Sequence, residues 1–563
     1  MRKYVDQSFD CSSWESVEKY LQELSDRSIQ NATDFQAWLK DKSELEAVLE
    51  ENMAWRYIRM TIDTTNEDYK KSYQFFVTEI QPNLAPFEDS LNRKMLSQPW
   101  CSELENDAAY SIYFRSARIA QELYREENIP LETELNSLSQ EYGGITGQQM
   151  ITYNGKELTM PQAANFLKDT NEFVRQEVFT LIAERRAQDR EKLDELFNKL
   201  VQLRHQIALN ADCSDYRAYK FKALGRFDYS IEDCLQFHDA VAEPIVPLVR
   251  QLQQKQAKEL GKEKLRPWDS EVDPKGKPAL KPFENGEQLI EGTIQMFQKL
   301  DPYFASCLTT MRKDGYLDLD SKPGKAPGGY NYPLYECGIP FIFMNAAGAQ
   351  RDLVTMVHEG GHAVHSFLSR DLELTGFKSL PSEVAELASM SMELLTMDLW
   401  DTFYSDADDL KRAQREQLEG IIKILPWIAM IDAFQHWIYT NPQHTVAERT
   451  AEWLSLGERF GTGMMDYSDF EYVKQSSWQR QLHLFEVPFY YIEYGIAQLG
   501  AIGVWKNFEK DSVKAIDQYK KALALGYTRS IPDIYKEAGL QFDFSSATLK
   551  ELAEFIQQKL QGY

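Results

Sequence analysis

Residues 353–368 constrain the fold of the chain more than any other segment. This segment is mostly apolar, yet it carries His358, Glu359 and His362 close together. An apolar run of this length predicts a buried helix, and residues four apart on a helix project from nearly the same side. The two glycines between Glu359 and His362 cost such a helix roughly 1 kcal/mol each relative to Ala. Their presence predicts that the backbone needs room beside the two histidines.

The three polar residues of this segment have the chemistry of a metal-dependent hydrolase. Neutral imidazole is a good zinc ligand, and a catalytic zinc typically takes three protein ligands and leaves a fourth position to water. The metal lowers the pKa of that water from ~15.7 to about 7 and polarises a substrate carbonyl. A carboxylate within reach then accepts the proton of the water. We therefore predict one Zn²⁺ per chain, bound by His358 and His362, with Glu359 as the general base.

A third metal ligand is needed from elsewhere. Position 368 is Leu, which excludes the arrangement with a further His six residues after His362. His365 lies on the same face one turn further along, and we assign it to the surroundings of the metal, where such residues orient ligands. Residues 382–395 predict a second helix, with Ser379 or Ser382 as its N-cap. Three carboxylates share one face of that helix, and the residues alone do not choose among them: Glu383, Glu386 and Glu393.

Together the two segments resemble a known family. The run His-Glu-Gly-Gly-His-x-x-His at 358–365, followed 24 residues after His362 by Ala-Glu-Leu-Ala-Ser at 385–389, resembles the thimet oligopeptidase and oligoendopeptidase F family of zinc peptidases. The oligoendopeptidase F branch is the more similar one. The resemblance implies that Glu386 is the third zinc ligand and that Glu383 supports the site without binding zinc. Gly360 departs from the family, whose members more often carry a larger residue there, but no ligand is lost.

Two upstream stretches extend the resemblance. Residues 324–330 resemble the family's glycine-rich loop, and residues 340–345 resemble the strand whose edge pairs with the substrate backbone. The residues alone predict a flexible loop followed by a short buried strand at 341–344. No phosphate-binding glycine pattern is present in the loop. The resemblance implies a group of substrate-binding residues: Gly328, Gly329, Tyr330, Phe341 and Phe343.

A downstream stretch, residues 483–494, is rich in aromatic side chains. The residues alone favour core packing, because tyrosine is abundant in this chain, with 29 copies. The stretch also resembles the family's C-terminal motif, in which a His and a pair of Tyr face the zinc. The resemblance implies that His483, Tyr491 and Tyr494 donate hydrogen bonds to the developing oxyanion. A small shift in register would bring Tyr490 into one of these places.

Periodicity predicts a predominantly α-helical fold, because apolar residues recur at three- and four-residue spacing along most of the chain. The resemblance implies two helical lobes enclosing a deep substrate channel, with a small β-sheet beside the zinc helix. We place an N-terminal helical lobe at 1–200 and the catalytic zinc-peptidase domain at 201–563. The clearest helical segments are 17–24, 44–61, 115–126, 189–208 and 230–256, the strand signals are 149–153, 158–160 and 341–344, and the clearest loop is 255–286.

Charge and cysteine content narrow the range of partners. The formal net charge of −25 argues against nucleic acid or an anionic membrane as a partner. The six cysteines show no CxxC spacing and fit a reduced interior. The first residues lack a hydrophobic signal core, and no stretch approaches 18 uncharged apolar residues. We expect a cytoplasmic protein, a monomer or a small homo-oligomer, that acts on short unfolded oligopeptides.

These observations predict a zinc-dependent endopeptidase that hydrolyses short oligopeptides. One alternative is a helical zinc carboxypeptidase that trims peptide C-termini, which needs a site for the terminal carboxylate that the sequence does not reveal. The other is a non-catalytic peptide-binding helical protein with a vestigial metal helix. The intact Glu359 beside both histidines argues against this second alternative.

Overall fold

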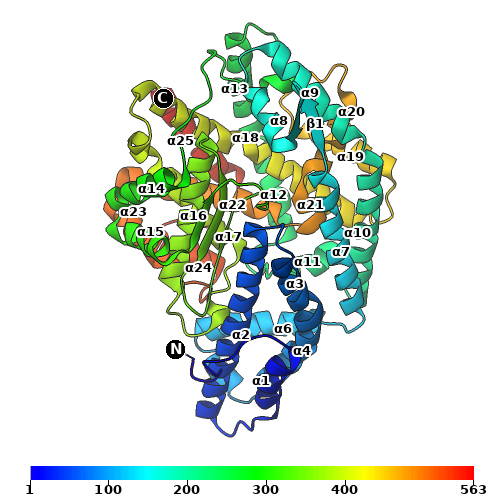
Figure 1. The fold of residues 1–563 in the computed structure, drawn as a ribbon, viewed down its shortest axis with the longest axis vertical. Helices are drawn as coiled ribbons and strands as arrows, with labels where there is room; N and C mark the ends of the chain where they lie inside the picture. Colours follow the sequence, from blue (N-terminus) through cyan, green and yellow to red (C-terminus); the bar gives the residue numbers. More distant parts are fainter. Residues whose placement is uncertain (1) are drawn as a thin grey trace. The chain divides into compact units, whose positions relative to one another are not determined.

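The computed structural model describes residues 2–563, and it is predominantly helical, with two small sheets (Figure 1). This confirms the predicted fold class. The chain divides into two compact units, each assembled from three segments. Unit 1 comprises Met1–Tyr124, Lys281–Ala413 and Gly500–Phe542, and unit 2 comprises Arg125–Leu280, Gln414–Leu499 and Asp543–Tyr563. The sequence-based division at residue 200 stays a prediction.

Unit 1 contains the predicted metal helix and a three-stranded sheet. The sheet has the order β3-β5-β4, and its strands are β3 (Leu317–Asp320), β4 (Tyr330–Tyr332) and β5 (Phe341–Ala346). The helices that lie wholly within this unit are α1 (Trp14–Asp26), α2 (Ala32–Ile62), α3 (Glu67–Phe75), α4 (Gln81–Leu96), α5 (Cys101–Leu104), α6 (Ala108–Leu123), α14 (Gly286–Leu300), α15 (Pro302–Asp314), α16 (Gln350–Ser369), α17 (Ser382–Thr396), α23 (Ser512–Ala524) and α24 (Ile531–Glu537).

Helix α16 is the predicted metal helix, and it lies in the core of unit 1. The carboxylate of Asp352 caps its N-terminus, accepting hydrogen bonds from the backbone N–H groups of Ala347 at 2.8 Å and Ala349 at 2.9 Å. Helices α14, α15, α17 and α23 contact α16, as do strands β4 and β5 (Figure 1). Apolar residues of α16 such as Leu353 and Val357 are fully buried, so the helix is fixed by packing on several sides.

Unit 2 is also mainly helical and carries a two-stranded antiparallel sheet of β1 (Met150–Tyr153) and β2 (Lys156–Thr159). Helices α18 (Ala407–Thr440) and α22 (Tyr491–Lys510) each run from one unit's segment into the other's. The helices wholly within unit 2 are α7 (Asn128–Gly147), α8 (Met160–Ala164), α9 (Glu172–Ala187), α10 (Arg190–Asn210), α11 (Tyr216–Ala223), α12 (Ile231–Ala242), α13 (Ile245–Glu259), α19 (Val446–Arg459), α20 (Glu471–Ser476), α21 (Leu482–Glu486) and α25 (Ser546–Gly562).

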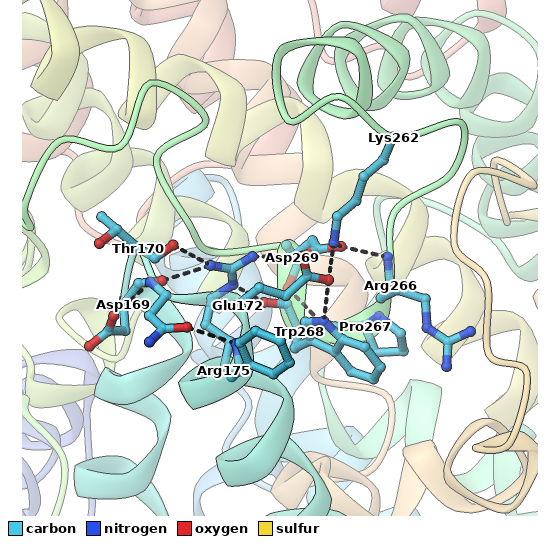
Figure 2. A network of polar contacts seen from close by, with 12 residues as sticks. Asp169, Thr170, Glu172, Arg175, Lys262, Arg266, Pro267, Trp268 and Asp269 are labelled. Atoms are coloured by element: carbon cyan, nitrogen blue, oxygen red, sulfur yellow. Dashed lines mark hydrogen bonds and ion pairs between the residues drawn. The ribbon is translucent and has the colours of Figure 1, made fainter.

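A buried ion-pair network fixes the loop that follows α13 in unit 2 (Figure 2). Asp269, which is fully buried, accepts hydrogen bonds from Arg175 Nη2 at 2.8 Å and Lys262 Nζ at 2.7 Å. Arg175 also donates to the backbone carbonyls of Trp268, Asp169 and Thr170. Nearly every polar atom of the pair is therefore used, as a buried ion pair requires. The loop predicted at 255–286 is thus held in place, and only its first residues belong to α13.

Two predicted elements differ from the structure. The helix expected over 230–256 is two helices, α12 and α13, because Pro244 lacks a backbone N–H and its ring clashes with the preceding turn. The helix α17 begins at Ser382, but Pro381 rather than a serine occupies its N-cap position. Strands β3 and β4 were not expected from the sequence. They are only four and three residues long, too short for a clear alternation of apolar and polar residues.

Helix α18 is long and apolar enough to resemble a membrane span. Its most apolar window has a mean hydropathy of 1.2, and 72% of that window is buried inside the protein. A helix buried in a protein core can be equally long and apolar. Pro426 and the buried Asp432 also lie within α18.

Candidate metal-dependent active site

Helix α16 presents the side chains of His358, Glu359 and His362 in unit 1. The rings of the two histidines lie 4.9 Å apart between centroids. Their side chains are 21% and 19% exposed, whereas the Glu359 residue is only 6% exposed. The imidazoles therefore remain accessible while the carboxylate is desolvated.

The glycines of α16 allow its close approach to α17. A methyl group on Gly361 would lie 2.6 Å from the Cα of Ser389 and 2.9 Å from the carbonyl oxygen of Ala388. Both neighbours are backbone atoms of α17, which cannot move aside independently. A methyl on Gly360 would instead meet the ring of Phe297 at 2.8 Å. The space beside the histidines that the two glycines predicted is needed because α17 packs directly against α16.

This approach brings Glu386 of α17 to the two histidines. Its Oε2 lies 3.3 Å from His358 Nε2 and 3.8 Å from His362 Nε2. One ligand atom from each of the three residues lies within 4.8 Å of the others. Two imidazoles and one carboxylate are the donor set of many catalytic zinc sites. The residues present therefore fit a divalent metal, and the structure brings together the three ligands that the resemblance implied.

Neighbouring side chains fix the orientation of the ligands. Glu393 Oε1 lies 2.7 Å from His358 Nδ1, which leaves Nε2 of the same ring facing Glu386. Ser389 Oγ donates to Glu386 Oε2 at 3.1 Å. Carboxylate partners of this kind fix the tautomer of a ligating histidine and raise its basicity. The sequence had left Glu393 as an alternative ligand, and the signal for its position was the seven-residue spacing from Glu386, two helical turns along the same face.

Burial and charge shift the pKa values of the cluster in different directions. Burial, together with the nearby Glu386 and Glu393, raises the pKa of Glu359 to about 7. Burial would also raise the pKa of Glu386, but His358 and His362 outweigh it and lower the value to about 2. Burial lowers the pKa of His362 to about 4. At neutral pH Glu386 is therefore ionised and His362 uncharged, the forms that bind metal. Burial would lower the pKa of His358, but Glu386 and Glu393 raise it well above its usual value, so a metal would displace a proton from this ring.

Two further predicted residues lie near this cluster but outside the group of three ligand atoms. His365 is buried on α16, and burial lowers its pKa to about 3, so it is uncharged at neutral pH. Glu383 is 2% exposed, and its backbone carbonyl accepts a hydrogen bond from Tyr535 Oη at 3.1 Å. Their supporting role stays a prediction.

The three-stranded sheet requires a correction to the predicted substrate strand. Strand β5 lies in the middle of the sheet, parallel to β3 and antiparallel to β4, so both of its edges are already paired. Phe341 and Phe343 are 3% and 0% exposed. The edge strands are β3 and β4, and Asn331 of β4 donates to the backbone carbonyl of Glu359 at 3.2 Å. Strand β4 is therefore the edge strand that this hydrogen bond ties to α16 at Glu359.

The glycine-rich loop before β4 is anchored to the sheet. Asn345 of β5 donates to the carbonyl oxygens of Ala326 at 2.7 Å and Gly328 at 2.9 Å. Gly328 has a φ of +99°, a conformation that favours glycine. The ring of Tyr330 stacks on Phe343 at 4.7 Å, and its hydroxyl lies 2.6 Å from Thr61 Oγ1. Gly328, Gly329 and Tyr330 thus lead directly into the edge strand.

The aromatic residues of the C-terminal stretch form a cluster within unit 2. The His483 ring lies 4.8 Å from that of Tyr491 and 5.7 Å from that of Tyr494, and Tyr490 lies 5.3 Å from Tyr494. None of these four residues is fully buried. The structure therefore brings His483, Tyr491 and Tyr494 together.

A hydrogen-bond relay determines which nitrogen of His483 carries the proton. Trp427 Nε1 can only donate, and it lies 2.9 Å from Oε1 of Gln481, which must therefore be the amide oxygen. The other amide atom, Nε2, donates to His483 Nδ1 at 2.7 Å. The proton of the neutral ring is thus on Nε2, which becomes a hydrogen-bond donor. Sequence reasoning missed Gln481, because no spacing pattern marks a residue that acts through side-chain hydrogen bonds.

Comparisons with known proteins show which family the chain matches. Residues 165–554 match the model of peptidase family M3, and residues 6–124 match the peptidase M3 N-terminal domain. Oligopeptidase PepF of Bacillus subtilis (strain 168) is 26% identical over 282 residues, which cover 49% of this chain and 41% of PepF. The aligned part thus spans less than half the length of that relative.

Two solved structures are similar over the whole chain. An X-ray structure assigned as an oligoendopeptidase F has a TM-score of 0.92 at 28% identity. A structure of PZ peptidase A with an inhibitor has a TM-score of 0.91 at 27% identity. Each alignment covers 100% of this chain and 99% of the other. The family model spans well over half of the sequence, and on this evidence the chain belongs to peptidase family M3.

Proposed function

We propose that this protein is a zinc-dependent endopeptidase that hydrolyses short oligopeptides. The observation that carries the proposal is the meeting of His358, His362 and Glu386 on two closely packed helices, with the desolvated Glu359 between the two histidines in sequence. When bound by these three residues, Zn²⁺ supplies polarisation of the scissile carbonyl and lowers the pKa of a water to about 7.

Glu359 acts as the general base in this proposal. Its pKa of about 7 lies near neutral pH, where a carboxylate is able both to accept a proton and to release it. A nearby dication lowers this pKa and favours the ionised form. Glu359 takes the proton from the attacking water and then delivers it to the leaving amine.

His483, Tyr491 and Tyr494 stabilise negative charge on the substrate oxygen in this proposal. The Nε2–H of His483 and the two phenol groups are neutral donors that lie close together. Donors of this kind contribute about 10²–10³ each to the rate when they bond mainly in the transition state.

The substrate is an extended peptide that pairs with the edge of β4. A peptide added to a sheet edge is held by main-chain hydrogen bonds, so many sequences are accepted. Binding at an edge strand also requires no terminal carboxylate, which favours internal cleavage over the trimming of C-termini. The names of the similar proteins, an oligopeptidase and an oligoendopeptidase F, support short peptides as substrates. We further propose a cytoplasmic location, in keeping with the acidic composition and the cysteine thiols.

Mass spectrometry of a mixed peptide library tests this function. The protein is incubated with the library as purified, after treatment with a zinc chelator, and after zinc is restored. We expect internal cuts that disappear with the chelator and return with zinc. Stepwise loss of C-terminal residues would instead identify a carboxypeptidase, and intact peptides under all conditions would identify a binding protein.

A further inference from the structure

A second cluster of metal-ligating side chains lies in the interior of unit 2. Helix α12 carries Cys234 and His238, and helix α18 carries Asp432 and His436. In each helix the two residues are four apart, so both side chains of a pair project from the same side. The two pairs meet where α12 and α18 face each other, and all four residues are buried.

The distances within this cluster are those of a coordination site. One ligand atom from each of Cys234, Asp432 and His436 lies within 4.8 Å of the others. Asp432 Oδ2 lies 3.2 Å from His436 Nε2 and 2.8 Å from His238 Nε2. Ligands about 2.0–2.3 Å from a tetrahedral zinc lie roughly 3.3–3.7 Å apart, so only small movements are needed. The spacing in the proposed catalytic site, 3.3 and 3.8 Å, is similar.

Several polar atoms of the cluster lack hydrogen-bond partners within residues 2–563. Asp432 Oδ1 and His436 Nδ1 make no hydrogen bond among these residues, and His436 Nε2 has the 3.2 Å contact to Asp432 Oδ2. Aromatic rings surround the site: Phe489 lies 5.3 Å from the ring of His436, and Phe221 lies 5.9 Å from it. Buried polar atoms in such surroundings are costly unless they are bonded. A cation between the side chains would satisfy the carboxylate and one imidazole nitrogen together.

Charge balance also favours a divalent cation. The thiol of Cys234 gives up its proton when it binds a metal. Asp432 Oδ2 lies between the imidazoles of His436 and His238, and an aspartate binds a metal as the carboxylate. One thiolate, one carboxylate and two neutral imidazoles around a dication carry no net charge, which is the state that a buried site favours.

We propose that Cys234, Asp432 and His436 bind a structural divalent metal ion such as Zn²⁺ in unit 2. His238 is either the fourth ligand or the hydrogen-bond partner that orients Asp432. The mixed sulfur, nitrogen and oxygen donor set favours Zn²⁺ over Mg²⁺ or Ca²⁺, which prefer oxygen ligands. The site fixes α12 against α18. It is separate from the His358, His362 and Glu386 cluster, which belongs to unit 1. The competing description is a metal-free network in which Asp432 bonds two histidines.

Cobalt substitution distinguishes the metal site from the metal-free network. Of the two proposed metal sites, only the one in unit 2 contains a cysteine sulfur, so its cobalt form has a distinct absorption spectrum. The full chain is stripped with a chelator, loaded with Co²⁺ and freed of excess metal. We expect two cobalt ions per chain by elemental analysis and a thiolate-to-cobalt charge-transfer band in the absorption spectrum. The His, His and Glu set of unit 1 cannot produce that band. One cobalt ion per chain without the band, in protein with native circular dichroism, would overturn the proposal.

Four variants assign the band to its residues. Cys234→Ser is expected to lose the band and one cobalt ion, while His362→Gln loses one cobalt ion and keeps the band. Cys307→Ser, a matched control at another buried thiol in α15, is expected to keep both. A band that survives Cys234→Ser would also contradict the proposal. If Cys234→Ser does not fold, His436→Gln replaces it, with the same expected loss of one cobalt ion and a shifted or absent band.

Discussion

At the scale of single residues, Glu386 is the proposed ligand whose role rests on the most specific geometry. Replacing it with Gln removes the anionic donor, and we expect zinc retention to fall by at least 10–100-fold. Glu383→Gln removes a carboxylate of the same helix that is not a proposed ligand, and its loss of zinc should be the smaller of the two. Zinc measured per chain after dialysis against a chelator checks both variants. Full retention in Glu386→Gln would shift the ligand assignment to another carboxylate of α17.

In the proposed mechanism, Gln481 acts on the reaction only through its hydrogen bond to His483. Gln481→Leu removes the donor to Nδ1, so the proton of the ring is no longer held on Nε2, and we expect kcat and kcat/KM to fall together by roughly 10–100-fold. Trp427→Phe removes the hydrogen bond to Oε1 and part of the packing against Trp453, and we expect it to lower kcat less than Gln481→Leu does. Metal content and melting temperature should stay unchanged in Gln481→Leu. Normal turnover in Gln481→Leu would remove this relay from the active site.

The sequence predicts those site residues whose side-chain type and spacing are distinctive. His358, Glu359 and His362 were identified by helical spacing alone, and the structure brings Glu386 to them. Glu393 was left as an alternative ligand and Gln481 was assigned no role, because the contacts of both depend on a partner reached in three dimensions. The buried pairs of Cys234 with His238 and of Asp432 with His436 show the same limit. Each pair is spaced by four residues, but the two pairs are almost 200 residues apart in sequence.

At the scale of elements, Gly361 sets the distance between α16 and α17. Gly361→Ala would force a methyl group against the backbone of α17, and overpacking of this kind costs about 1–3 kcal/mol. We therefore expect a lower melting temperature and weaker zinc retention, because Glu386 moves away from the histidines. The control is Gly420→Ala in α18, where a methyl meets no atom within 4 Å among the described residues. That variant should gain up to about 1 kcal/mol from helix propensity.

The Asp269 network should make the stability of unit 2 depend on pH. Burial would raise the pKa of Asp269, but hydrogen bonds from Lys262 and Arg175 outweigh it, so the pKa is lowered. A lowered carboxyl pKa stabilises the fold above the unfolded value of about 3.9, and this stabilisation is lost as pH falls through the folded pKa. We expect Asp269→Asn to cost roughly 3–5 kcal/mol at pH 7, because Arg175 loses its buried partner, and less at pH 3.

Denaturant unfolding at the two pH values measures this effect. Asp517→Asn is the control, because Asp517 forms an exposed pair with Lys521 and its side chain is 58% exposed. Such pairs contribute little, and the control should change stability by less than about 1 kcal/mol. An equal loss for Asp269→Asn at pH 3 and pH 7 would contradict the linkage argument.

The elements themselves were predicted where their periodicity is long. The helices at 353–368 and 382–395 correspond to α16 and α17 to within a few residues. The order of the sheet was not predicted, because β3 and β4 are short and pair with β5 from opposite sides. The substrate edge was therefore placed on β5, whose apolar sequence reflects burial in the middle of the sheet. Pairing partners are set by tertiary packing, which single-strand patterns do not encode.

At the scale of the whole molecule, the predominance of helix followed from periodicity, whereas the arrangement of segments did not. Each compact unit is built from three stretches that are separated in sequence. The helical pattern of a stretch indicates which face is buried but not which distant stretch covers it. Membership of peptidase family M3 is the finding that joins these segments into one known fold.

The most direct test of the account is the turnover of a Glu359→Gln variant at matched zinc content. The amide is nearly the same size as the carboxylate but cannot accept a proton, so zinc binding and peptide affinity should be preserved. We expect kcat for internal cleavage of a short peptide to fall by about 10²–10⁴, the usual contribution of general base catalysis. Near-normal kcat in zinc-loaded Glu359→Gln would contradict the assignment of Glu359 as the base and, with it, the proposed mechanism.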